Sequence, residues 1–115
     1  MSKIEGDDFD IFSIYRSQDE KEEILHEILK LINFEKPTII LGDLNLNILK
    51  CPEHSILRNL KDLSFKQLVQ TPTHEQGGLL DLVFMSHHFN QNEVTIENVS
   101  VYYSDHDLIH IKMNL

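Results

Sequence analysis

The segment GDLN at residues 42–45 carries side chains that could act together on a phosphate ester. Asp43 and Asn45 are two residues apart and directly follow the β-favouring run TIIL at residues 38–41. A carboxylate can orient or deprotonate a water molecule, and an amide can hydrogen-bond a phosphate oxygen. Gly, Asp and Asn also form ordinary turns because they tolerate unusual backbone angles, so a plain turn stays open as the alternative.

A second segment places one carboxylate inside an apolar run. Asp81 interrupts LLDLVF at residues 79–84, shortly after the PTH segment at residues 72–74. Burying an ionised carboxylate is costly unless another group pairs with it, so a buried Asp81 needs a partner. The alternative is a strand-edge position at which Asp81 faces water.

The third segment, YSDHD at residues 103–107, sets Asp105 beside His106. Together they offer a cation ligand and an imidazole that titrates near neutral pH, although a polar hairpin would use the same residue types. The chain has seven histidines. His106 and His110 are spaced H-x₃-H, but no histidine belongs to an HExxH motif, and the sequence does not predict a zinc site.

Alternating strand and helix patterns surround these segments. Leucines and isoleucines at helical spacing predict a helix over about residues 18–33, with Ser17 and Glu20 as a capping box. Pro52 suits the first turn of a second helix, whose apolar residues share one face. Strands are predicted over residues 10–16, 38–41, 65–70, 79–85, 94–103 and 108–113. This order predicts an α/β domain with a mixed β-sheet.

Composition narrows the class of protein. The length of 115 residues fits one domain, and 10 basic against 19 acidic residues give a net charge of −9. That charge disfavours binding to nucleic acid by bulk attraction. Cys51 is the single cysteine, which excludes an internal disulfide. The sequence shows no membrane span and an acidic start, so we expect an intracellular protein, cytoplasmic or nuclear, that is not secreted.

In this order, GDLN, PTH with LLDLVF, and YYSDHDLI closely resemble the C-terminal half of the endonuclease/exonuclease/phosphatase superfamily. Within it, the chain is most similar to the apurinic-endonuclease-like domains of non-LTR retrotransposons. The segment IYR at residues 14–16, which leads into an amphipathic helix, fits the strand that carries an active-site tyrosine in that family. The resemblance spans about residues 11–111.

The resemblance implies roles for the first two segments. Asp43 matches the aspartate that positions and activates the attacking water, and Asn45 matches the asparagine that holds the scissile phosphate and that water. Tyr15 matches a tyrosine that contacts the phosphate. Thr73 matches, more loosely, a threonine near the DNA backbone. The implied reaction is metal-assisted hydrolysis of a DNA phosphodiester.

For the third segment, the resemblance implies that Asp105 lies near a Mg²⁺ ion. His106 matches the histidine that contacts the phosphate and stabilises the charge developing on it. Asp81 matches the carboxylate that hydrogen-bonds this histidine, which would supply the partner that a buried Asp81 needs. The resemblance thus places Asp43, Asn45, Asp81, His106 and Tyr15 in catalysis.

The chain departs from the family at its start. Complete family domains place an asparagine on a first strand and a glutamate, the main Mg²⁺ ligand, before the tyrosine strand. Here fourteen residues precede Tyr15, with no asparagine and no predicted strand pair, and Glu5 has no matching context. We therefore expect residues 1–115 to form a partial domain whose N-terminal half is absent. Its Mg²⁺ site would be incomplete.

This departure shapes the expected architecture and function. The expected fold is half of a four-layer α/β-sandwich of the DNase I-like kind, with two main helices on one face of the sheet and the other face open. The leading hypothesis is a truncated, Mg²⁺-dependent, retrotransposon-like endonuclease that is inactive as an isolated chain. The alternative is a non-catalytic module that associates, for example as a homo-oligomer, through the open face. A phosphatase of the same superfamily, acting on a phosphorylated lipid or inositol, is the third reading.

Overall fold

The computed structural model describes residues 2–5, 8–15, 23–43, 47–50, 54–74, 77–90, 92–101 and 104–114. The helices are α1 (Glu23–Leu31) and α2 (Ser55–Asp62). The strands are β1 (Ser2–Glu5), β2 (Asp10–Tyr15), β3 (Thr38–Asp43), β4 (Phe65–Gln67), β5 (Asp81–Ser86), β6 (Val94–Val99) and β7 (Leu108–Met113).

The main sheet has five strands in the order β1-β2-β3-β5-β4. β2 and β3 run parallel, and the other neighbours are antiparallel, so the predicted mixed sheet is confirmed. β3 and β5 lie at the centre, and most of their residues are buried. This agrees with their unbroken apolar sequences, which are typical of strands covered on both faces.

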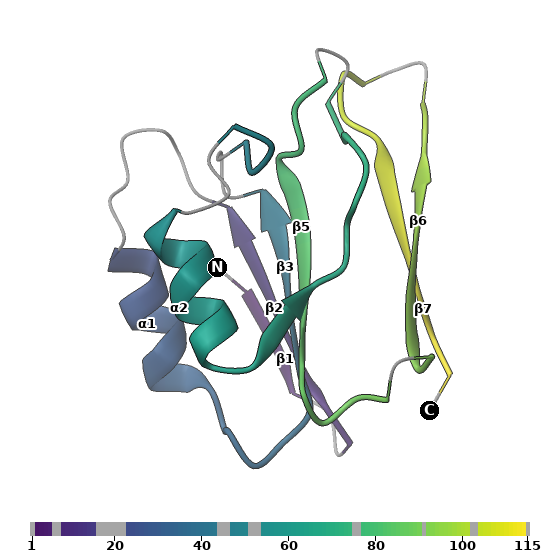
Figure 1. Ribbon diagram of the computed structural model, residues 1–115. Coiled ribbons are helices and arrows are strands. Elements are labelled where there is room, and N and C mark those ends of the chain that lie inside the picture. The colour runs from purple at the N-terminus through teal and green to yellow at the C-terminus, as the bar shows by residue number, and fades with distance from the viewer. Residues whose placement is uncertain are drawn as a thin grey trace.

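The molecule has three layers: the two helices, the main sheet and a two-stranded ribbon formed by β6 and β7 (Figure 1). The predicted placement of both helices on one face is confirmed (Figure 1). The expectation that the other face stays open is wrong, because the ribbon packs against it through partly buried apolar side chains. These are Ile96, Ile109, Ile111 and Met113.

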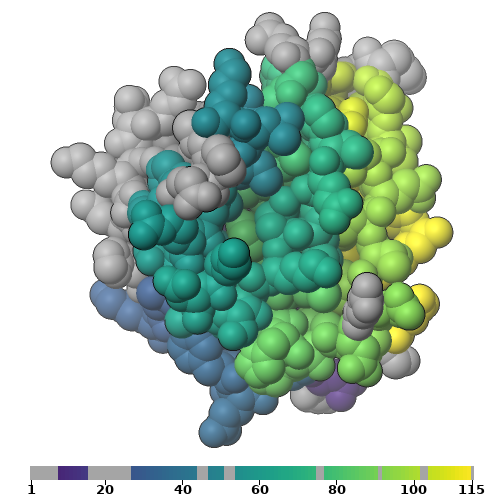
Figure 2. Space-filling model, viewed as in Figure 1, coloured from purple at the N-terminus to yellow at the C-terminus, as the bar shows by residue number. Residues whose placement is uncertain are grey.

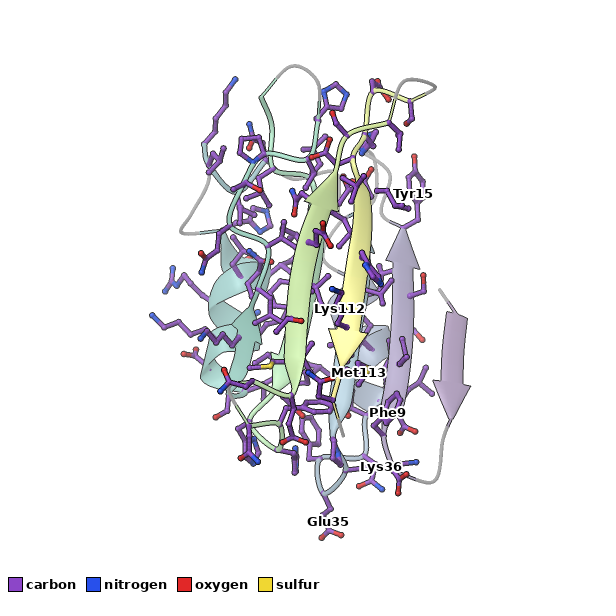
Figure 3. All side chains as sticks on the ribbon, turned by 90° about the vertical axis from the view of Figure 1, so that its right-hand side faces the viewer. Phe9, Tyr15, Glu35, Lys36, Lys112 and Met113 are labelled. Carbon is purple, nitrogen blue, oxygen red and sulfur yellow. The ribbon has the colours of Figure 1, made fainter. Side chains whose placement is uncertain are left out.

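The ribbon covers only part of that face. Seen from the ribbon side, β6 and β7 lie in front of the centre of the sheet, while β1 and β2 lie beside them (Figure 3). Along β7 the side chains alternate between exposed and partly buried. The strand therefore turns one row of residues toward the sheet and the other toward solvent.

Several element boundaries differ from the predicted ones. β1 was not predicted, and its antiparallel pairing with β2 supplies the strand pair that the sequence does not suggest. β4 ends at Gln67, whose side chain bonds the backbone N–H and C=O of Val69 at 2.7 and 2.6 Å. β6 ends at Val99 rather than Tyr103. The capping residues Ser17 and Glu20 lie outside the described residues.

The second helix begins later than predicted. Its N-cap is His54, whose Nδ1 accepts a hydrogen bond from the backbone N–H of Ile56 at 3.2 Å. Pro52 lies outside the described residues.

Among the described helices, neither is long and apolar enough to cross a membrane.

Candidate active site

Three of the predicted site residues form a row across the main sheet. Tyr15 on β2 is in register with Asp43 on β3, and Asp43 is in register with Asp81 on β5. Residues in register on neighbouring strands present their side chains on the same face. Because Asp81 lines a cavity together with residues of β7, the row lies on the ribbon face, at the end of the sheet where β2 and β3 finish and β5 begins.

Gly42 allows β3 to reach this row. Its φ is +141°, and a Cβ atom added there would lie 1.8 Å from the carbonyl oxygen of Ile14. No other residue fits a backbone approach this close. The glycine of GDLN therefore sets the geometry immediately before Asp43.

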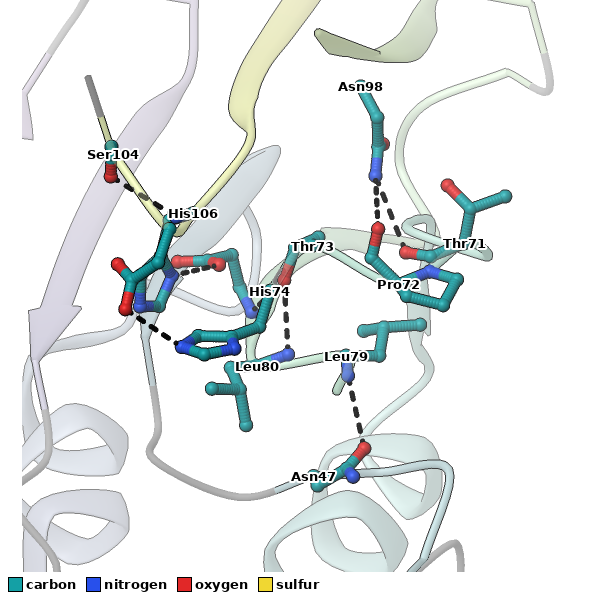
Figure 4. Close-up of polar contacts among 12 residues, drawn as sticks. Asn47, Thr71, Pro72, Thr73, His74, Leu79, Leu80, Asn98, Ser104 and His106 are labelled. Atoms are coloured by element: carbon teal, nitrogen blue, oxygen red, sulfur yellow. Dashed lines mark hydrogen bonds and ion pairs between the residues drawn. The ribbon is translucent and has the colours of Figure 1, made fainter. Parts of the chain in front are cut away.

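His106 reaches the row from the segment that leads into β7. His74 and His106 form an isolated β-bridge, and the N–H of Asp107 donates to the carbonyl of Thr73 at 2.6 Å. This junction carries the His106 ring to Asp81, where Nδ1 lies 2.7 Å from Oδ2 (Figure 4). The predicted contact between Asp81 and His106 is confirmed.

The carboxylates of the row surround His106. One ligand atom from each of Asp43, Asp81 and His106 lies within 4.8 Å of the others. The hydrogen bond to Asp81 is the largest cause that raises the pKa of the His106 imidazole, burial lowers this pKa by a smaller amount, and the charges of Asp81, Asp43 and Asp105 each raise it further. The site therefore favours an imidazolium, which can stabilise a negatively charged group.

Sequence reasoning gave His74 no role, yet the structure places it at the site. Its Nε2 lies 3.1 Å from Oδ2 of Asp105, and its ring meets the ring of His106 edge to face, with centroids 4.9 Å apart (Figure 4). The sequence signal was its place directly after Thr73 in the PTH segment. That signal is weak, because the contact depends on a bridge between segments 32 residues apart.

Thr73 has a different role from the predicted contact with substrate. Its side chain is 1% exposed. Its Oγ1 accepts hydrogen bonds from the backbone N–H groups of Leu80 and Asp81, each at 3.1 Å (Figure 4). Thr73 thus fixes the start of β5, and with it Asp81, instead of facing a ligand.

The remaining predicted residues are placed as follows. Tyr15 is 66% exposed at the end of β2 (Figure 3). The Asp105 side chain is also exposed and lies against His74. Asn45 lies outside the described residues.

A larger hollow lies away from the row. It lies on the helix side between α2 and β4 and has a volume of about 500 Å³. Figure 2 shows the molecule from the edge at which α2 and β4 face the viewer. Its lining includes the apolar residues Leu57, Phe65 and Phe84 and the basic residues Arg58 and Lys61. A smaller cavity of about 230 Å³ adjoins the row, between Asp81 and the ribbon residue Ile109.

A family model described as endonuclease-reverse transcriptase matches residues 9–110 of the chain. No curated protein sequence matches the chain significantly.

Three solved structures are similar in fold. The Haemophilus ducreyi cytolethal distending toxin has a TM-score of 0.72 and 15% identity, covering 98% of this chain and 52% of that one. The cytolethal distending toxin of Actinobacillus actinomycetemcomitans has a TM-score of 0.70 and 14% identity, covering 96% and 51%. The beta toxin of Staphylococcus aureus has a TM-score of 0.61 and 17% identity, covering 97% and 55%. The chain thus spans about half the length of these structures.

Proposed function

Since the chain belongs to the endonuclease-reverse transcriptase family of endonuclease/exonuclease/phosphatase domains, with an α/β DNase I-like fold, we propose that it supplies part of a retrotransposon-type endonuclease site that hydrolyses a DNA phosphodiester. The observation that carries this proposal is the ion pair of His106 and Asp81 at 2.7 Å, with Asp43 beside it in register. A carboxylate next to a fixed imidazolium is a suitable arrangement for attack by water on a phosphate.

Each side chain has a proposed task. Asp43 orients the attacking water and takes its proton while the new P–O bond forms and the bond to the leaving sugar oxygen breaks. His106 faces the phosphate as an imidazolium and stabilises its negative charge, and Asp81 fixes the orientation of the ring. The hydroxyl of Tyr15 donates a hydrogen bond to a phosphate oxygen. For Asn45 we propose the task that the family resemblance implies, which is to hold the scissile phosphate and the attacking water.

Mg²⁺ is the metal that the family resemblance implies, and the described residues fit it poorly. Mg²⁺ prefers an octahedron of oxygen ligands. Of the three nearby carboxylates, Asp81 is bonded to His106 and Asp105 to His74, while Asp43 stands beside the imidazolium. Both groups of metal-ligating type that the described residues form contain histidine. The proposed steps therefore use only the side chains of this chain.

This poor fit favours the second candidate, in which these 115 residues alone are a non-catalytic module. We expect the chain to bind Mg²⁺ weakly and to nick supercoiled plasmid DNA no faster than its Asp43→Asn variant. Metal-assisted hydrolysis needs both a bound metal ion and a positioned water. The described residues are better suited to position the water than to bind Mg²⁺. Robust Mg²⁺-dependent nicking that is lost in Asp43→Asn would contradict the expected inactivity and establish the enzyme.

Contact with DNA is tested separately, by NMR at low salt. A short DNA duplex should shift the ring resonances of His106 and Tyr15, whereas an uncharged peptide nucleic acid duplex of the same sequence should not. Low salt is needed because the net charge of −9 opposes binding to DNA. If DNA perturbs the helix-side hollow at Leu57 and leaves His106 unchanged, the proposed site is wrong.

A further inference from the structure

Two imidazoles and one carboxylate meet where the PTH and YSDHD segments join. One ligand atom from each of His74, Asp105 and His106 lies within 4.8 Å of the others. All three belong to the described residues, and the β-bridge between His74 and His106 fixes the two backbones against each other. Two histidines and one carboxylate suit zinc and its neighbours in the periodic table better than they suit Mg²⁺.

The spacing of two of these donors agrees with a coordinated ion. His74 Nε2 and Asp105 Oδ2 are 3.1 Å apart. Metal–ligand bonds of about 2.0–2.1 Å place two ligands of a tetrahedral ion about 3.3 Å apart. An ion could thus replace the hydrogen bond between these atoms with a small movement, with the His74 ring in the tautomer that carries its proton on Nδ1.

The third donor is already oriented by a carboxylate. Asp81 holds Nδ1 of His106 at 2.7 Å, so an ion would bind at Nε2 and displace the proton that the imidazolium carries there. Metal-binding histidines characteristically donate their other ring N–H to a carboxylate, which fixes the tautomer and the ring orientation. Asp105, 59% exposed on its side chain, leaves the ion accessible from solvent and leaves room for water as a further ligand.

From this geometry we propose that His74, Asp105 and His106 bind one divalent transition-metal ion of the Zn²⁺ class. The site shares Asp105 with the Mg²⁺ site that the family resemblance implies, and differs from it in its two histidine ligands. It rests on the positions of these three side chains and does not depend on the proposed nuclease function.

The test is titration of the whole chain with Zn²⁺ by calorimetry, and with Co²⁺ by visible absorption. All proteins carry Cys51→Ser, because a thiolate would bind the same ions. We expect one Zn²⁺ per chain, binding much tighter than Mg²⁺, and a Co²⁺ spectrum of the intense kind that low coordination numbers give. His74→Gln and Asp105→Asn should each weaken binding by about tenfold or more.

The matched control is His110→Ala, since His110 also faces a carboxylate, Glu97, at 3.7 Å but has no second histidine in that pair. It should leave the affinity unchanged. Circular dichroism of each metal-free variant shows whether it is folded, and His74→Gln is chosen because it can keep the hydrogen bond to Asp105. The proposal is overturned if no stoichiometric Zn²⁺ binding is found, or if His110→Ala weakens it equally. It is also overturned if Asp43→Asn abolishes binding while His74→Gln does not, which would place the ion beside Asp43.

Discussion

Asp81 shows how a single charged residue is accommodated in an apolar strand. It stands at the first position of β5, half-buried, and its partner His106 comes from 25 residues further along the chain. Pairing offsets the cost of removing the carboxylate from water. The same contact gives the imidazole its charge, so one ion pair both stabilises the strand end and prepares a phosphate-binding group.

Replacing Asp81 by Asn should lower the pKa of His106, because it removes the hydrogen bond and the nearest negative charge that raise it. A raised folded-state pKa stabilises the fold below the pKa of an unfolded histidine, and this contribution is lost as the pH rises through the folded-state pKa. Asp81→Asn should remove that pH dependence. NMR titration of the His106 ring and thermal melting across this pH range would measure both effects.

The control is Asp62→Asn, which changes an exposed carboxylate on α2 by the same chemistry. This substitution should leave the pKa of His106 unchanged. An unchanged His106 pKa in Asp81→Asn would mean that the pair does not form in solution.

At the scale of elements, the approach of β3 to β2 depends on Gly42. Gly42→Ala should destabilise the fold by about 4 kcal/mol or more, since its Cβ would collide with the backbone of Ile14. Gly77→Ala is the matched comparison. Gly77 also has a positive φ, +90°, but an added Cβ would meet nothing within 4 Å, so the expected cost is about 1–2 kcal/mol.

Urea unfolding of both variants measures the difference. Equal losses in Gly42→Ala and Gly77→Ala would show that backbone conformation alone, and not the contact with Ile14, requires the glycine.

The strands and helices with strong local patterns were predictable from sequence. The apolar runs of β3 and β5, the helical spacing in α1 and the alternation in β7 each identify their element. β1 was missed because four residues are too short to show a period. The ribbon was assigned to strands correctly, but alternation says only that one row of side chains is buried, not which sheet buries it.

The candidate site was predictable where a residue type was unusual for its position in the sequence. An acid inside an apolar strand required a partner, and the family resemblance supplied His106. Thr73 and His74 were harder. The buried hydrogen bonds of Thr73 and the pairing of His74 with Asp105 both depend on how distant segments join, which no local pattern records.

For the whole molecule, we expect the partial covering of the main sheet by the ribbon to influence association between chains. The ribbon has two strands, and such a unit is weakly stable unless it packs on something larger. Leu108, at the start of β7, is 54% exposed beside the cavity next to Asp81. We expect the chain to associate as its concentration rises, with the net charge of −9 limiting the extent.

Sedimentation velocity over a wide concentration range, together with thermal melting, tests this expectation. Leu108→Asn should shift the chain toward monomer, and Leu49→Asn, an equally exposed leucine on another surface, should not. A monomer at every concentration with a sharp melting transition would show that the ribbon alone covers the face sufficiently.

The row formed by Tyr15, Asp43 and Asp81 lies at one end of the main sheet. We expect the connections at that end to be fixed in length, and those at the other end to be free to vary. The connections at the row's end of the sheet carry the side chains of the candidate site. The described connections at the opposite end carry none of them (Figure 1); these are residues 8–9, 32–37, 63–64, 87–90 and 92–93. One residue inserted after Asp81 would turn it to the other face of the sheet and separate it from His106. Insertions in the opposite connections would leave the row in place, so related chains should vary in length there.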